Sequence, residues 1–431
     1  MKKLFLIIVL LGLFLMAAKI FAIPPWGENY RYSAYVHVYD EYGNPKPNIW
    51  VSLTVTAEDR ITLQPLGGTV SGKTDANGYV VLNYYISWDY DPDLIDMMAY
   101  VSDSYYTAIQ CSGNYTTTGN TLYPEFWVMK DLDQNGIADD YELPLAEKFC
   151  PDVCMHKNNP MIPSPVEILL DNTSLCYWLK PPDHTFFDIH YDKDRDEMSA
   201  QEAFELSKNL WDSDWWLDFG GKNAQRNVDY WHTYYNSIKD NYPAPTLYTH
   251  CFLDNEDVVI QYWFFYPYNA WCADHEGDWE HINVKVSSAY PDQAGPLEVV
   301  YYFHKKRLTL SWNNTWHNGN HPQVYVGGTA PGLFRGEESG GSYPWPGPWI
   351  DVAGTLEETI IPGRVINHSQ FNLVNVTKNY NLWWMKFPGY WGVPCELICV
   401  DPPNVVRNAP RSPIHHECWE VYKHKKYSEY E

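Results

Sequence analysis

The residues with the clearest chemistry lie in one short segment, 131–142, whose sequence is DLDQNGIADDYE. A glycine stands at loop position 6, and oxygen-bearing side chains stand at positions 1, 3, 5, 9 and 12: Asp131, Asp133, Asn135, Asp139 and Glu142. Calcium takes roughly six to eight oxygen ligands, and this spacing supplies them around a sharp turn at the glycine. The segment therefore predicts a calcium site, and the alternative is a solvated acidic loop.

The sequence before this loop, residues 126–129, is typical of a strand and not of an entering helix. The loop is therefore not one half of a paired helix–loop–helix calcium unit. It resembles the single calcium loops of thrombospondin type 3 repeats and dockerins. That resemblance implies a mechanical role, in which a bound ion fixes the angle between the parts of the chain on either side. We expect chelation to loosen that arrangement more than it melts either part.

A second acidic group lies in the segment HEGDWEH at 275–281, which follows an apolar run at 258–266. Alternate residues of a strand share a face, so Asp278 and Glu280 share theirs with the apolar residues at 282, 284 and 286. We expect that face to be buried, where two carboxylates are costly unless a cation meets them. The segment predicts a second divalent cation on Asp278, Glu280 and His275. The alternative is pairing of the carboxylates with an Arg or Lys side chain.

A cation at this position would leave coordination sites open for a ligand. His304, Trp271 and Trp279 are the candidate ligand-binding residues around it, although the tryptophans could equally belong to the core. The leading hypothesis is therefore a metal-dependent β-sandwich that binds surface glycans or lipid headgroups.

Two other functions fit the same residues. In a metal-dependent hydrolase that uses segment 275–280, Glu276 or Glu280 would act as general base on a metal-bound water. The chain has neither G-x-S-x-G nor H-E-x-x-H, so its catalytic residues stay unknown and enzymatic activity is uncertain. A purely structural surface or adhesion component would need no site at all.

The elements that must position these residues are mostly strands. The chain has 20 Trp and 35 Tyr, which suit pleated, half-buried surfaces. Short β-rich runs broken by turn residues predict a small immunoglobulin-like β-sandwich over residues 23–130. A calcium-binding loop and helix linker follows at 131–150, with the helix ended by Pro151. Residues 151–431 are predicted to form a larger aromatic-rich β-sandwich domain with a few helices, one of them at 199–210.

Two resemblances bear on these domains. The hairpin YDEYGNPKP and the later turn TDANG resemble those of immunoglobulin-like or transthyretin-like modules of bacterial surface proteins, which usually act as spacers. Further along, LAEKFCP, QYWFFYPYN, HEGDWEHINV and HPQVYVGG stand in the order typical of the vacuolar protein sorting-associated protein 62 family. His304 stands where that family has a strand-end histidine, whereas Ala330 and Pro331 replace its usual Ser-His. The resemblance implies membership for the larger domain, without a particular reaction.

The D-W-E core at 278–280 is also similar to the G-H-R-H-D-W-E segment of necrosis- and ethylene-inducing peptide-like proteins. This shorter resemblance implies a secreted β-sandwich that holds a divalent cation with the equivalent acids and binds sphingolipid sugar headgroups. The preceding Arg and His of that heptapeptide are absent here.

The N-terminus predicts export. Lys2 and Lys3 precede an apolar run at 4–18 that ends in small residues, as in a cleavable signal peptide over residues 1–22. The alternative is a retained anchor, although the run is shorter than the roughly 20 residues of a spanning helix. We expect a secreted, extracellular or periplasmic protein without a transmembrane segment after cleavage. The net charge of −24 argues against nucleic acid as a partner, and the oligomeric state is not predicted.

Nine cysteines in an exported chain predict structural disulfides, with at least one thiol left over because the count is odd. Two pairs, Cys150 with Cys154 and Cys395 with Cys399, have a spacing that also fits half of a zinc site. Zinc sites favour tighter spacing and nearby histidines, so disulfides are the preferred interpretation.

Overall fold

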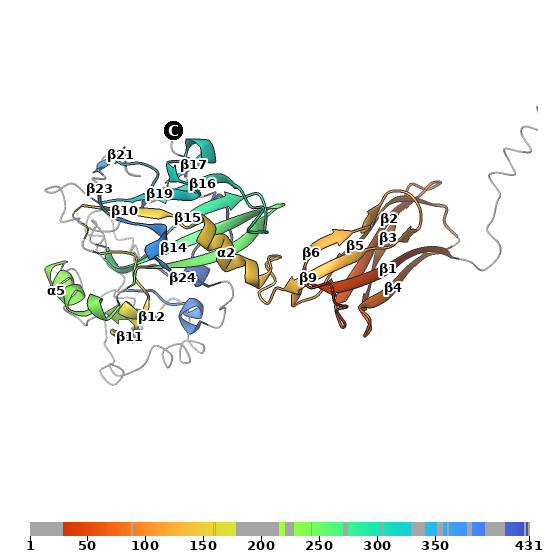
Figure 1. Cartoon of the computed structure of the whole chain (residues 1–431), viewed down its shortest axis with the longest axis horizontal. Coiled ribbons are helices and arrows are strands. Elements are labelled where there is room, and N and C mark those ends of the chain that lie inside the picture. Colours follow the sequence, from red (N-terminus) through yellow and green to blue (C-terminus); the bar gives the residue numbers. More distant parts are fainter. Residues whose placement is uncertain are drawn as a thin grey trace, which may run out of the picture. The chain divides into compact units, whose positions relative to one another are not determined.

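The computed structural model describes residues 29–87, 89–157, 159, 161–177, 215–219, 228–242, 244–269, 275–303, 306–328, 341–350, 357–359, 362–376, 382–392, 410–425 and 428–429. The chain divides into two compact units, Met1–Gln134 and Asn135–Glu431 (Figure 1). The predicted leader at 1–22 and the predicted helix at 199–210 lie outside the described residues. Within the described ranges, no helix is long and apolar enough to cross a membrane.

The first unit is a β-sandwich, coloured red to orange in Figure 1. Its described strands form one sheet in the order β4-β1-β9-β6, with β8 also pairing with β1, and a second in the order β3-β2-β5-β7. Their apolar residues alternate along each strand, and the inward set, such as Ala34, Val36 and Val38 of β1, is fully buried between the sheets. The strands are β1 (Tyr30–Asp40), β2 (Trp50–Asp59), β3 (Pro65–Lys73), β4 (Tyr79–Ile86), β5 (Pro92–Val101), β6 (Tyr106–Ser112), β7 (Tyr115–Thr116), β8 (Thr121–Leu122) and β9 (Glu125–Lys130).

Aspartates and glycines build the two turns singled out in the sequence. The Asp40 carboxylate accepts hydrogen bonds from the backbone N–H groups of residues 42 and 44, and Asp75 accepts them from residues 77 and 79. Gly78 has φ +69°, and a Cβ there would lie 2.4 Å from the Val38 carbonyl oxygen. The hairpin and turn therefore form where the sequence predicts them.

The second unit is built around a seven-stranded sheet in the order β24-β13-β14-β15-β16-β17-β25. A second sheet has the order β18-β19-β10-β23, with β20 also pairing with β19. The strands of the large sheet are β13 (Thr246–Asp254), β14 (Asp257–Asn269), β15 (His275–Val286), β16 (Pro296–Phe303), β17 (Lys306–Ser311), β24 (Asn372–Asn375) and β25 (Ser428–Glu429). Those of the second sheet are β10 (Asp152–His156), β18 (His317–Asn318), β19 (His321–Val326), β20 (Ser342–Tyr343) and β23 (Pro362–Ile366).

Smaller elements complete the second unit. Two strand pairs, β11 with β12 and β21 with β22, stand apart from both sheets. The remaining strands and helices are β11 (Thr173–Tyr177), β12 (Trp215–Phe219), β21 (Pro348–Ile350), β22 (Glu357–Thr359), α2 (Asp139–Phe149), α3 (Glu167–Leu170), α5 (Val228–Ile238), η2 (Lys239–Asn241), η3 (Trp312–Asn314), η4 (His368–Gln370), η5 (Trp383–Lys386) and η6 (Pro413–His415). The chain is thus mostly β, as predicted.

The central strands of the large sheet are buried on both faces. Ile282, Val284 and Val286 of β15 pack into a core shared with α2, β10 and β19. On the opposite face of the same strand, Trp279 joins a second core rich in Trp and Tyr. Burial of both faces explains why residues 258–266 form an almost continuous apolar run instead of an alternating one. The predicted burial of the face at 282–286 is confirmed, and the structure adds burial of the other face.

The helix predicted after the loop is α2, which ends at Phe149 just before Cys150 and Pro151. Its buried face includes Leu145 and Phe149. The Ala146 carbonyl accepts a hydrogen bond from the hydroxyl of Tyr262 in β14 at 2.8 Å. These contacts attach the end of the acidic loop to the large sheet.

Free thiols occur at all the cysteines whose side chains the structure describes, namely Cys111, Cys150, Cys154, Cys251 and Cys418. Four of the five thiols are buried. Burial raises the pKa of the Cys150 and Cys154 thiols, which keeps both protonated and poor as metal ligands. The spacing of these two residues therefore marks neither a disulfide nor a ready zinc half-site in this structure. The other four cysteines, including Cys395 and Cys399, have side chains outside the description.

Candidate metal sites

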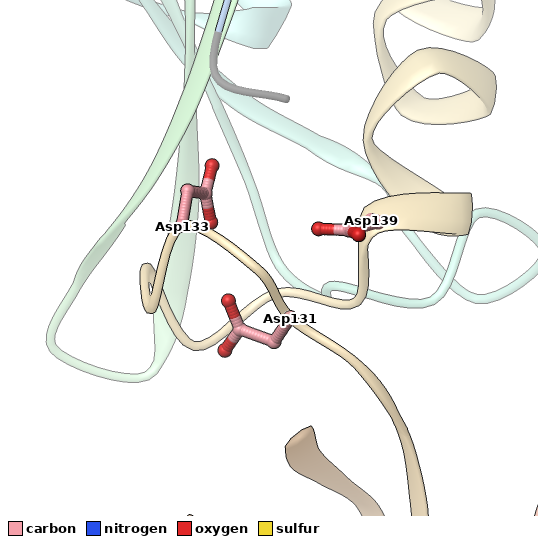
Figure 2. Close-up of side chains that lie close together, drawn as sticks. All are labelled: Asp131, Asp133 and Asp139. Carbon is pink, nitrogen blue, oxygen red and sulfur yellow. The ribbon is translucent and has the colours of Figure 1, made fainter. Parts of the chain in front are cut away.

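The acidic loop gathers three of its five predicted ligands. One carboxylate oxygen from each of Asp131, Asp133 and Asp139 lies within 4.8 Å of the others. Figure 2 shows the three side chains directed toward the space that the loop encloses. Asp131 and Asp139 are buried and Asp133 is partly exposed. Among the described side chains, this is the one group of three or more His, Cys, Asp or Glu residues close enough to share a metal ion.

The backbone of the loop depends on two residues in the left-handed region. Gly136, at the predicted turn position, has φ +84°, and Gln134 has φ +62°. A Cβ at Gly136 would lie 2.6 Å from Cδ1 of Leu253 in β13. The glycine therefore serves both the turn and the close approach of the loop to the sheet, as the sequence predicts for the turn.

The other two predicted ligands, Asn135 and Glu142, are joined to each other. Asn135 Nδ2 donates to Glu142 Oε1 at 2.5 Å, and Asn375 Nδ2 donates to Glu142 Oε2 at 2.6 Å. Asn135 Oδ1 accepts from the backbone N–H of Ile137 at 2.8 Å. Glu142 is only 1% exposed. Glu142 is not one of the acids that gather within 4.8 Å.

The electrostatics of the loop favour a cation. Carboxylates held this close repel one another, and burial of two of them removes the water that would screen the repulsion. Asp139 is the first residue of α2, whose N-terminal dipole offsets part of this charge. A hard divalent cation with oxygen ligands would offset the rest.

The second predicted site lies at the start of β15. Glu276 and Asp278 are buried, 2% and 7% exposed, and Glu280 is half-buried. Asp278 Oδ2 accepts a hydrogen bond from Asn269 Nδ2 at 2.9 Å, across from the paired strand β14. The side chain of His275 lies outside the description, so the proposed third ligand has no position here.

Tyr266 of β14 lies directly opposite Asp278. Burial, and after it the carboxylates of Glu280 and Asp278, raise the pKa of the Tyr266 hydroxyl well above its usual value. The hydroxyl is therefore a permanent hydrogen-bond donor in this acidic environment. Gly277 has φ +60°, and a Cβ there would lie 2.3 Å from the Trp391 carbonyl oxygen, so the chain at 391 closes tightly over the start of β15.

The candidate ligand-binding aromatics have different positions from those expected of a binding surface. Trp279 is 4% exposed, and its ring lies 4.9 Å from Phe265 and 5.4 Å from Trp391 between ring centroids. It belongs to the core, which leaves no exposed face for a ligand. Trp271 and His304 lie outside the described residues.

Two histidine arrangements have no counterpart in the sequence-based prediction. His281 is buried between the rings of Trp263 and Tyr302, at 4.3 and 4.2 Å, and burial followed by His416 and His424 lowers its pKa well below the usual value. His321 and His368 stack at 3.4 Å. Neither arrangement has a local motif, because each one joins residues far apart in sequence.

Comparison with known proteins assigns no family. No family model matches the chain, and no curated protein matches it. Similar solved structures are the non-toxic HaNLP3 protein, at 13% identity over 30% of this chain and 51% of that one with a TM-score of 0.21, and NLPPya in complex with mannosamine, at 12% identity over 59% and 85% with 0.29. The pilus adhesin SpaC from Lactobacillus rhamnosus GG matches at 8% identity over 80% and 29% with 0.17. The chain spans about half the length of HaNLP3. These scores are too low to assign a fold or a function.

Proposed function

We propose that this chain is an exported, calcium-binding protein of two β units, whose larger unit binds surface glycans or lipid headgroups with the help of a second divalent cation at the start of β15. The larger unit would belong to the vacuolar protein sorting-associated protein 62 family. The convergence of Asp131, Asp133 and Asp139 carries the calcium part of this proposal.

Calcium suits the loop because all the available donors are oxygens. Three carboxylates give the site its charge, and Asn135 and Glu142 lie next in the loop to complete the ligand set. Calcium sites of extracellular modules have dissociation constants of roughly 10⁻⁴ to 10⁻³ M, so calcium outside the cell would keep even a weak site filled. The ion would order the segment between β9 and α2.

The ligand-binding part is supported by the acids of β15. Glu276 and Asp278 are both buried, two residues apart at the start of β15. The Asn269 amide and the Tyr266 hydroxyl provide donors to the same region. A cation there would neutralise the carboxylates and could be coordinated by hydroxyl oxygens of a sugar or headgroup.

Glycan and lipid arrays probed with the full chain, with calcium and with a chelator, test this function. We expect binding that depends on the divalent cation and weakens at least tenfold in Asp278→Asn, with Asp292→Asn, an exposed aspartate of the same unit, as the matched control. Cation-independent binding, or none, would contradict the proposal and favour a structural surface or adhesion component.

A further inference from the structure

Residues 410–425 form a short segment of turns that lies against one face of the large sheet. Cys418 of this segment belongs to the aromatic core of that face, together with Trp263 of β14 and Tyr302 of β16. Tyr422 packs against the same core. Segment 410–425 therefore covers aromatic side chains of the central strands.

Polar side chains of the sheet hold this segment in place. Gln261 Nε2 donates to the Cys418 carbonyl at 2.9 Å, and Asn283 Nδ2 donates to the Tyr422 carbonyl at 3.1 Å. Both amide side chains belong to residues that are fully buried. The Tyr302 hydroxyl also donates to the Tyr422 carbonyl, at 2.7 Å. Because side chains make these bonds, the segment can open locally at less cost than the paired strands beneath it.

Four histidines meet where the segment contacts the sheet. His416 and His424 belong to the segment, His250 to β13 and His281 to β15. The rings of His416 and His281 lie 5.9 Å apart between centroids. The ring of His250 stacks on Trp419 of the segment at 3.8 Å. Protonation would therefore place positive charges close together in a contact that is shielded from water.

The carboxylates that face these histidines compensate such charges only in part. Glu420 Oε1 lies 3.3 Å from His250 Nε2, and Glu417 Oε2 lies 3.7 Å from His424 Nε2. Both glutamates are exposed, so water screens their attraction. Arg307 adds a positive charge, because its Nη1 donates to the His424 carbonyl at 2.6 Å. The other charged side chains described at this contact lie around Tyr422 and are Lys285 with its partners Asp254 and Asp257, Glu298 and Lys423.

The environment of the histidines favours their neutral form while the segment is attached. Burial lowers the pKa of His416 to about 4, with Glu417 opposing the shift and His424 adding to it. Burial also lowers the pKa of His250, and Glu420 opposes that shift. In a released segment both pKa values return toward 6.5. Attachment is therefore fully favoured above pH 6.5 and weakens as the pH falls toward 4.

We propose that segment 410–425 is an acid-sensitive cover, which detaches when His416 and His250 take up protons and thereby exposes the aromatic face of β14, β15 and β16. Two histidines on opposite sides of one contact make the response cooperative, because each proton weakens the attachment that keeps the other histidine neutral. A proton on His281 is not required. The inference goes beyond the function proposed above and needs neither cation site.

Thiol labelling of the full chain at pH 7 and pH 5 tests this inference, because Cys418 is a fully buried free thiol within the segment. Dithiodipyridine reacts with thiols at both pH values, and mass spectrometry locates the labelled residues. The exposed thiol of Cys111 corrects for the effect of pH on the reagent. Relative to Cys111, Cys418 should react roughly 20-fold faster at pH 5 from the His416 shift alone. Cys150 and Cys251, in the core on the other face of the sheet, should stay protected.

Variants assign the response to the histidines. His416→Gln should reduce the increase at Cys418 at least fivefold, and His250→Gln should also reduce it. His415→Gln, which changes the exposed histidine next to His416, should leave the increase unchanged. Urea unfolding at pH 7 establishes that each variant is folded.

Three results would overturn the proposal. The first is equal labelling of Cys418 in the unmodified chain at pH 7 and pH 5. The second is an equal increase at Cys150 and Cys251, which would mean that the whole unit unfolds and the segment does not open locally. The third is an undiminished increase in a folded His416→Gln variant.

Discussion

The acidic loop at 131–142 and the acidic start of β15 contain the same kinds of side chain but arrange them differently. In the loop, three aspartate carboxylates approach within 4.8 Å and two are buried. At the start of β15, Asp278 is bound by the Asn269 amide, and neighbouring chain closes over the backbone at Gly277. A turn can bring several carboxylates of one short segment together. In a strand, the position of each carboxylate depends on the neighbouring strand with which it pairs.

The largest expected difference between the two regions is in the loss of stability when alanine replaces their positive-φ glycines, Gly136 and Gly277. Gly277→Ala should destabilise the second unit by about 3 kcal/mol, because it combines left-handed strain with a clash against the rigid Trp391 carbonyl. Gly136→Ala should cost about 1–2 kcal/mol, because its clash is with the flexible end of Leu253. Urea unfolding in calcium measures both. Equal losses would contradict the view that the start of β15 is the more tightly enclosed region.

The aromatic side of β15 should respond to pH through buried histidines. Burial lowers the pKa of His416 from 6.5 to about 4, with Glu417 opposing the shift and His424 adding to it. Between these values the unfolded chain binds more protons, so stability present above pH 6.5 is lost as the pH falls toward 4.

For His416 alone this loss is about 2 kcal/mol between pH 7 and pH 5. His416→Gln should flatten the pH dependence of the unfolding free energy over that range. His37→Gln, in the first unit, is the control. An unchanged pH dependence in His416→Gln would show that the imidazole gains a proton without cost in the folded chain.

A smaller effect on stability is expected at Asp278. Asp278→Asn keeps a side-chain oxygen that can accept from Asn269, so the unfolding free energy should change by less than about 1 kcal/mol. Elemental analysis should nevertheless find one divalent ion fewer per chain. A large loss of stability with no change in ion content would mean that the carboxylate pairs within the protein and holds no metal.

The sequence predicts most of the first unit and the turn of the loop, because their signals are local. Alternating residues of β1, the aspartate-based turns and the glycine at 136 each depend on near neighbours in the chain. The helix after the loop is predicted for the same reason. Local spacing is sufficient where one segment makes both the turn and the ligands.

Local spacing is insufficient where a second layer covers the strand. Alternation in β15 indicates the buried face at 282–286. The opposite face is buried by segments that are distant in sequence, so the residues near β15 give no sign of it. Trp279 consequently lies in a core instead of at a binding surface. The pairing of His321 with His368 depends on the register of β19 and β23 against β10, which the sequence does not reveal.

Calcium calorimetry on the full chain tests the central claim most directly. The unmodified chain should bind calcium at the loop, Asp131→Ala with Glu142→Ala should lose one site, and Asp140→Ala, an exposed acid of the same loop, should keep it. Because the buried Glu142 accepts two amide hydrogen bonds, its loss could destabilise the fold, so Asp133→Asn serves as a milder variant that should bind at least tenfold more weakly while folding normally. Unchanged calcium binding in both the double variant and Asp133→Asn would contradict the account.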